Sequence, residues 1–240
     1  MIDISVILPT YNEKGNIIPL IKSIFRTALF AKAKYEAIVV DDSSPDGTAV
    51  VCKHAFRGKR SVRVFVRKKE RGLASAIWFG VQKARGKQVV VMDTDLSHDP
   101  SVIPKLGEAC RKATLAIGSR YITGGGMENS RRYWLSRFFN IYLRLLFHLP
   151  VTDFLSGFFC VDRKFILSLG NSDAGLFAGY GDYFMRLITK VKQAGGTFYE
   201  IPVYYRNRPY GESKSRFIPM FISYTIASLK LRGTDELPKR

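Results

Sequence analysis

The chain has 240 residues, 46% of them hydrophobic, so it can form a globular core and is not a disordered protein. Its 38 Lys and Arg residues outnumber 20 Asp and Glu residues, and the net charge of +18 favours anionic partners such as nucleotides, phosphates, nucleic acid or an acidic membrane surface. Three widely spaced cysteines, Cys52, Cys110 and Cys160, form no CxxC pair, which argues against a disulfide framework or a zinc site and indicates a reducing compartment.

Short apolar segments alternate with helical patterns over residues 1–121. Apolar, β-branched runs predict buried strands at residues 4–10, 35–42, 61–68, 87–95 and 113–121. Apolar residues at helical spacing predict helices at residues 14–34, 46–54, 72–85 and 100–112. This alternation is typical of a mostly parallel sheet with helices on both faces, so we predict an α/β fold.

The second half is less regular, and two of its segments are rich in aromatic residues. Around residues 131–149, and again over 217–232, basic side chains are interleaved with aromatic ones, a pattern typical of helices that lie in a membrane surface. Core helices with exposed basic faces are the alternative interpretation. No apolar stretch is long enough to span a bilayer, and the N-terminal residues lack a secretory signal pattern. We therefore expect a soluble or membrane-surface protein.

Polar clusters follow four of the predicted strands. They occupy residues 10–13, 41–44, 93–95 and 118–120. Ligands of parallel α/β sheets bind beyond the carboxyl ends of the strands. One such cluster is an ordinary turn, whereas four at one edge of a sheet predict a binding site.

Asp93 and Asp95 end the fourth predicted strand. Carboxylate oxygens suit Mg²⁺ or Mn²⁺, which then bridge substrate phosphates. The alternative is a turn or helix cap, since Asp favours both.

A nucleotide could bind at the first two clusters. Tyr11 could stack on a base, while Glu13 and either Asp41 or Asp42 could accept hydrogen bonds from base or ribose. Alternatively, Pro9 and residues 45–47 simply form turns. Neither a G-x-G-x-x-G motif after the first strand nor a P-loop is present, which disfavours those two nucleotide-binding folds.

A set of basic residues provides candidate phosphate ligands. Arg132 and Ser136 are four residues apart and share a helix face. Arg208 and Lys214 flank a glycine and a serine hydroxyl, an arrangement that can hold a phosphate. Solvated surface charges are the alternative. Among the three histidines, only His98 follows the Asp93–Asp95 turn, and we expect it to support that turn.

Seven segments in this order resemble the motifs of one enzyme family: PTYNE, VVDDSSPDGT, RGLASAI, VVMDTDLSHDP, AIGSRY, DFLSGFF and RPYGESK. They are similar to those of dolichol-phosphate mannose synthases and related polyprenyl-phosphate glycosyltransferases, which are inverting family 2 glycosyltransferases of the GT-A fold. The resemblance covers residues 1–216. It implies one GT-A domain there, with a donor half at about 1–121 and an acceptor half at about 122–216. A C-terminal amphipathic helix and tail would follow over 217–240.

The resemblance also implies roles for individual residues. The donor nucleotide would be bound by Pro9, Tyr11, Glu13, Asp42 and Asp41. Asp93 and Asp95 would hold Mg²⁺ or Mn²⁺ on the donor diphosphate, and Asp95 and Arg120 would be catalytic. The lipid phosphate would be bound by Arg132, Ser136, Arg208 and Lys214.

Two positions stay open. Many relatives carry glutamine where this chain has Ser97, so a third metal ligand is unassigned. Asp182, within GYGDYF, could serve as a catalytic carboxylate, but its alignment with the family is loose.

The predicted activity is transfer of mannose from GDP-mannose to a polyprenyl phosphate. We expect it at the cytoplasmic face of a membrane, the endoplasmic reticulum in a eukaryote. Several relatives continue into transmembrane helices, whereas this chain ends at Arg240, so surface helices or a membrane-anchoring subunit would hold it there. Transfer of another sugar, such as glucose from UDP-glucose, is the alternative. A basic nucleic-acid-binding protein and a membrane scaffold with a decayed site are non-enzymatic alternatives, although no nucleic-acid-binding motif is present.

Overall fold

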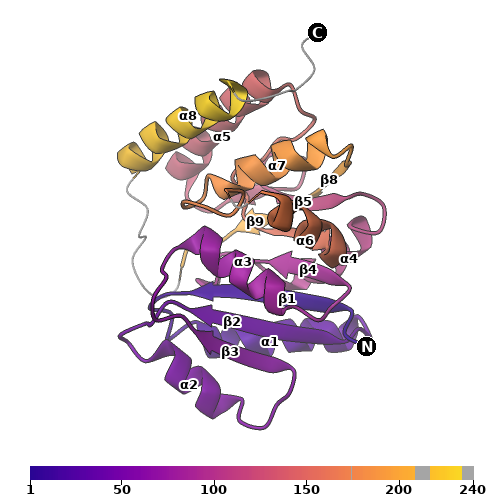
Figure 1. Ribbon diagram of the computed structural model, residues 1–240, viewed down its shortest axis with the longest axis vertical. Helices are drawn as coiled ribbons and strands as arrows, with labels where there is room; N and C mark the ends of the chain where they lie inside the picture. Colours follow the sequence, from indigo (N-terminus) through magenta and orange to yellow (C-terminus); the bar gives the residue numbers. More distant parts are fainter. Residues whose placement is uncertain (174, 209–216, 234–240) are drawn as a thin grey trace.

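A seven-stranded sheet is the centre of the computed structural model, which describes residues 1–173, 175–208 and 217–233 (Figure 1). Its spatial order is β3-β2-β1-β4-β7-β5-β8. All neighbours pair in parallel except β7, which runs antiparallel to β4 and β5. The strands are β1 (Ile4–Thr10), β2 (Tyr35–Asp41), β3 (Val62–Val66), β4 (Gln88–Val91), β5 (Leu115–Ser119), β7 (Phe159–Asp162) and β8 (Phe198–Pro202).

Helices cover both faces of this sheet, and a small second sheet pairs β6 (Gly126–Met127) with β9 (Tyr204–Tyr205). The helices are α1 (Ile17–Phe30), α2 (Thr48–Ala55), α3 (Leu73–Lys83), α4 (Ile103–Ala109), α5 (Ser130–Phe147), α6 (Arg163–Ser172), α7 (Tyr183–Gln193) and α8 (Phe217–Gly233), with a 3₁₀ turn at Pro100–Val102.

Alternating side chains of the central strands divide the hydrophobic core in two. In β1, Val6 and Leu8 join the core beneath α1, α2 and α4, whereas Ile7 joins the core beneath α3, α5, α6 and α7. Every residue of β1 is buried. A strand covered on both faces has no polar side, which is why the sequence shows continuous apolar runs rather than alternation.

The predicted α/β fold with a mostly parallel sheet is therefore confirmed, while several of its details differ from the prediction. The strand expected at 87–95 ends at Val91, because the chain then leaves the sheet for a turn in which Leu96 adopts a positive φ of 63°. Strand β7 was not predicted, because four residues following a Gly-containing turn carry too short a pattern to separate from a loop.

Helices α5 and α8 lie side by side at one end of the molecule (Figure 1). The ring centroids of Phe139 and Phe221 are 4.7 Å apart, and the hydroxyls of Tyr142 and Ser228 are 3.3 Å apart. Among the described residues, no helix combines the length and apolarity needed to cross a bilayer. Both helices nevertheless expose large apolar side chains: Trp134, Leu135, Phe138, Ile141 and Leu145 on α5, and Phe221, Ile222, Ile226 and Leu229 on α8.

Candidate active site

A cavity of about 630 Å³ opens beyond the carboxyl ends of β1, β2 and β4. Its lining comes from the turns after these strands, the chain after β9, and helices α5 and α8. Ten residues singled out from the sequence line it: Pro9, Tyr11, Glu13, Asp42, Asp93, Asp95, Arg120, Arg132, Ser136 and Arg208. The structure thus brings the predicted donor side and the predicted acceptor side into one space.

Two predicted residues are not in this set. Asp41 is buried, and its carboxylate accepts hydrogen bonds from the backbone N–H and hydroxyl of Ser44, at 2.9 and 2.5 Å. It therefore stabilises the turn after β2, and of the two adjacent aspartates it is Asp42 that lines the cavity. Lys214 lies outside the residues that the structure describes.

The turn that carries Asp93 and Asp95 is held on several sides. The backbone N–H of Asp93 donates to Nδ1 of His98 at 3.0 Å, as expected for a histidine that supports this turn. The hydroxyl of Thr94 donates to the carbonyl of Pro9 at 3.1 Å, which ties the turn to β1. The backbone N–H of Ser97 donates to the Asp95 carboxylate at 2.9 Å. These bonds compensate for the unfavourable positive φ of Leu96.

The two carboxylates of this turn differ electrostatically. Desolvation by the surrounding protein, followed by the charge of Asp95, raises the pKa of Asp93 to about 7, and its side chain lines the cavity. Burial also opposes ionisation of Asp95, but the Arg208 guanidinium outweighs it and lowers the pKa of Asp95. Nε of Arg208 lies 2.7 Å from Oδ2 of Asp95.

This donor set suits a hard divalent cation that is shared with a ligand. The described residues contain no group of three or more His, Cys, Asp or Glu side chains able to hold a metal by themselves. Mg²⁺ is commonly held by one or two carboxylates and completed by water and substrate phosphates. Asp93 and Asp95 fit that arrangement, with Ser97 beside them.

Asp42 is held in place by a residue that the sequence did not reveal. Its carboxylate accepts hydrogen bonds from Nε of Arg67, at 2.7 Å, and from the backbone N–H of Gly72, at 2.8 Å. Arg67 is buried and also donates to the carbonyl of Gly72. Gly72 has a φ of 137°, which favours glycine at this point of close approach. A basic residue near the end of the third predicted strand, residues 61–68, was the available signal for Arg67.

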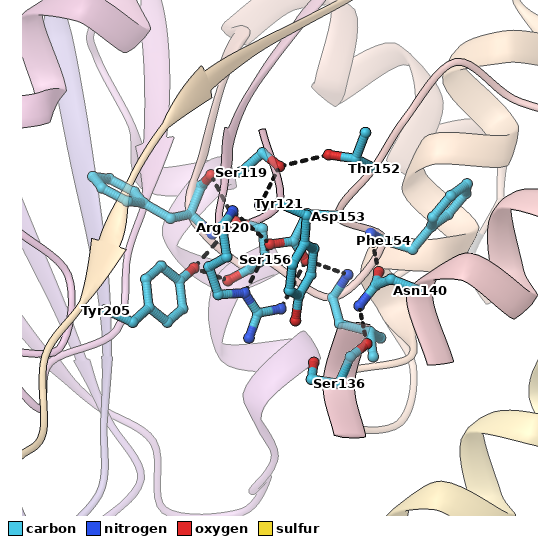
Figure 2. A network of polar contacts seen from close by, with 12 residues as sticks. Ser119, Arg120, Tyr121, Ser136, Asn140, Thr152, Asp153, Phe154, Ser156 and Tyr205 are labelled. Carbon is cyan, nitrogen blue, oxygen red and sulfur yellow. Dashed lines mark hydrogen bonds and ion pairs between the residues drawn. The ribbon is translucent and has the colours of Figure 1, made fainter. Parts of the chain in front are cut away.

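Arg120 is fixed by a second unpredicted residue, Asp153 (Figure 2). Its Nε and Nη2 donate to the two carboxylate oxygens of Asp153, both at 2.7 Å. The rings of Tyr121 and Tyr205 lie 5.0 and 4.9 Å from the guanidinium carbon. Burial opposes the charge of Arg120, but the interaction with Asp153 raises the pKa of this guanidinium overall. The DFLSGFF motif containing Asp153 was the available sequence signal.

The lining also includes Arg132 and Ser136 on α5, and Arg208, which contacts Asp95. Burial, and then the nearby charges of Arg208 and Arg120, lower the pKa of Arg132. Three guanidinium groups therefore repel one another around one cavity, and a bound anion would relieve that repulsion. Next to these cations the lining is apolar, with Leu135, Phe139, Met220, Phe221 and Tyr224 from α5 and α8.

Asp182 is engaged by groups close to it in the chain. Its carboxylate forms an ion pair with Arg186 at 2.5 Å and accepts a hydrogen bond from the backbone N–H of Tyr180. It is not among the described residues that line the cavity. The structure thus supplies no geometric argument for Asp182 as a base.

Comparison with protein families and curated proteins identifies relatives over most of the chain. The model of glycosyl transferase family 2 matches residues 5–170. The dolichol-phosphate mannosyltransferase of Pyrococcus furiosus is 37% identical over 218 residues, covering 88% of this chain and 58% of the relative. The Saccharomyces cerevisiae enzyme of the same name is 37% identical over 169 residues, covering 69% and 62%. The undecaprenyl-phosphate mannosyltransferase of Micrococcus luteus is 35% identical over 213 residues, covering 87% and 85%.

The chain thus spans about three fifths of the length of the first two relatives. Among solved structures, glucosyl-3-phosphoglycerate synthase of Mycobacterium tuberculosis, in complex with Mn²⁺, UDP and glucosyl-3-phosphoglycerate, has a TM-score of 0.74 and 21% identity. That alignment covers 99% of this chain and 81% of the other. The similarity confirms the expected fold.

If Asp93 is a metal ligand, as the sequence predicts, its raised pKa makes the affinity for Mn²⁺ depend on pH. A metal would bind the ionised carboxylate, so Asp93 would have to lose its proton first, and below pH 7 the affinity should fall by about tenfold per pH unit. Electron paramagnetic resonance of Mn²⁺ titrated with the protein between about pH 5.5 and pH 8 measures this. An affinity that does not change over this range would contradict the assignment, and Asp93→Asn should remove the dependence together with most of the binding.

Proposed function

The chain belongs to glycosyl transferase family 2, and on that premise we propose that it transfers mannose from GDP-mannose to a polyprenyl phosphate such as dolichyl phosphate. The observation that carries the proposal is that a pair of aspartates and a group of arginines line the same cavity. The names of the three curated relatives support the donor sugar and the class of acceptor. Family membership also favours an enzyme over a nucleic-acid-binding protein or a scaffold.

The donor would occupy the strand-end side of the cavity. The partly exposed ring of Tyr11 lines the cavity and would stack on the base, and the carboxylates of Asp42 and Glu13 would bind base or ribose. Asp93 and Asp95 would hold Mg²⁺ or Mn²⁺ against the diphosphate, and the similar mycobacterial structure contains Mn²⁺ and UDP. Once bound, the cation supplies positive charge that stabilises the departing diphosphate.

Arg120 would contribute a second positive charge to the leaving group. Asp153 engages its Nε and Nη2, and no described residue accepts a hydrogen bond from its Nη1. Arg120 also lines the cavity, so Nη1 is available to a phosphate oxygen there. Donors that are fixed before charge develops stabilise a transition state without reorganisation.

The acceptor would present its phosphate from the side of α5. A phosphate oxygen, already negatively charged at neutral pH, forms the bond to the anomeric carbon as the bond from that carbon to the diphosphate oxygen breaks. No proton has to be removed from the nucleophile, so a strong general base is not required. Arg132, Arg208 and Ser136 would hold the phosphate in line, on the face opposite the leaving group, and the sugar would be inverted.

Radiolabelled sugar transfer tests the proposal directly. We expect the purified chain to move label from GDP-mannose to polyprenyl phosphate when Mn²⁺ or Mg²⁺ is present, and not after chelation of the metal. UDP-glucose serves as the competing donor. Transfer from UDP-glucose but not from GDP-mannose would identify glucose as the donor sugar. Absence of transfer from both donors to the lipid would reject the proposal.

Asp95→Ala should reduce transfer by at least about a hundredfold, because it removes a metal ligand and the partner of Arg208. Steady-state kinetics at saturating Mn²⁺ measures the loss. Asp99→Ala is the matched control, since that aspartate caps the nearby 3₁₀ turn and does not line the cavity. Full turnover by the Asp95→Ala variant would refute the metal-binding role.

Arg132→Ala should raise the KM for polyprenyl phosphate by about tenfold and leave the KM for GDP-mannose within about twofold. The reason is that Arg132 faces the proposed acceptor side. Arg131→Ala is the control, because its exposed side chain on the same helix is outside the cavity lining. An equal effect on the two substrates would count against an acceptor-phosphate site at Arg132.

We also propose that the chain works as a peripheral protein on a membrane, on its cytoplasmic face, with α5 and α8 against the lipid. The acceptor is a lipid, and the apolar end of the cavity is built from these two helices. Neither helix contains Asp or Glu, while Arg131, Arg137, Arg144, Lys230 and Arg232 add positive charge. Apolar side chains flanked by basic ones suit the surface of an anionic membrane.

Removing two apolar side chains from this surface should weaken membrane binding by at least about tenfold. The test variant is Phe138→Ser with Leu145→Ser, and the measurement is co-sedimentation with anionic lipid vesicles. Leu29→Ser with Phe30→Ser is the control, since both side chains are at least as exposed but lie at the end of α1. Equal binding by the two double variants would contradict the assigned surface.

A further inference from the structure

The Arg120–Asp153 ion pair is buried (Figure 2), and Arg120 lines the cavity, so the pair places a fixed cation there. Asp153 is fully buried and accepts three hydrogen bonds from Arg120: from the backbone N–H at 3.1 Å and from Nε and Nη2 at 2.7 Å. The two tyrosine rings pack against the same guanidinium. Its orientation is therefore set before any ligand binds.

We propose that Asp153 is a positioning residue that acts on sugar transfer only through Arg120, by directing the remaining N–H groups of the guanidinium at the donor diphosphate. This inference rests on the proposed function. Asp153 itself is not among the residues that line the cavity, so it has no direct route to a substrate.

The energetics of buried ion pairs support a functional rather than a purely stabilising role. Removing two charges from water costs about as much as their attraction returns, and apolar replacements of such pairs are often neutral or stabilising. An ion pair at this position is thus a poor way to stabilise a fold. It is an effective way to hold a planar, bidentate donor group in one orientation.

The loop that carries Asp153 is itself held from two other elements. Glu200, on β8, accepts hydrogen bonds from the backbone N–H groups of Thr152 and Asp153, at 3.0 and 3.1 Å. The hydroxyl of Ser119, on β5, lies 2.7 Å from that of Thr152. These three hydrogen bonds fix the position of the loop relative to the end of β5, which Arg120 directly follows.

Asn140 connects the same loop to the acceptor side. Its Oδ1 accepts from the backbone N–H of Phe154 at 2.7 Å, and its Nδ2 donates to the carbonyl of Ser136 at 2.8 Å (Figure 2). Asn140 is buried on α5, one turn beyond Ser136 and two turns beyond Arg132. The loop thus sets the spacing between Arg120 and the helix that bears the proposed acceptor ligands.

Single and double substitutions at Arg120 and Asp153 test the inference. We expect Asp153→Asn to lower kcat about a hundredfold, in line with loss of one well-placed donor group. In an Arg120→Met background, Asp153→Leu should cost no further activity, because the group through which it acts is already gone. Asp162→Asn is the control: this aspartate only caps α6, and its variant should retain kcat.

Two results of these measurements would overturn the inference. A kcat within about twofold of wild type for folded Asp153→Asn would overturn the inference, as would a further loss of tenfold or more when Asp153→Leu is added to Arg120→Met. Circular dichroism and thermal melting identify folded variants. If Asp153→Asn does not fold, the kcat of Arg120→Met compared with that of the Arg120→Met, Asp153→Leu double variant still tests the inference. A wild-type chain without transfer activity would instead reject the proposed function.

Discussion

Repulsion between two phosphate-bearing substrates is the constraint on which the rest of this structure depends. The proposed reaction brings a sugar diphosphate and a lipid phosphate to opposite sides of one carbon atom, and at close range their negative charges oppose each other. The cavity lining contains a carboxylate pair suited to a divalent cation and three arginines, Arg120, Arg132 and Arg208, whose positive charges can offset this repulsion. Burial, and then the neighbouring positive charges of Arg208 and Arg120, lower the pKa of Arg132.

The sheet places these groups by topology rather than by sequence proximity. Parallel strands β1, β2 and β4 end at a common edge, so the turns after them converge on the donor side. Strand β7 runs antiparallel between β4 and β5, and the loop that precedes it brings Asp153 to Arg120. Helices α5 and α8 then close the cavity with an apolar wall that suits a polyprenyl chain.

Most of the fold and much of the candidate site were predictable from the sequence, for identifiable reasons. Buried parallel strands leave continuous apolar runs, and polar clusters such as Asp93–Asp95 stand out directly after them. Arg67 and Asp153 were missed because their roles depend on partners 25 and 33 residues away, which no local pattern encodes. Asp41 and Asp42 are adjacent, and only the side-chain bonds to Ser44 and Arg67 distinguish the residue that holds a turn from the one that faces the cavity.

A crystal structure of the chain with Mn²⁺, GDP and a short-chain polyprenyl phosphate, recorded at the manganese absorption edge, tests the central claim most directly. The account predicts an anomalous peak bonded to Asp95 and to the diphosphate, with the lipid phosphate held by Arg132 across the same cavity. A lipid phosphate bound outside this cavity, or manganese with no carboxylate of the Asp93–Asp95 turn as a ligand, would contradict it.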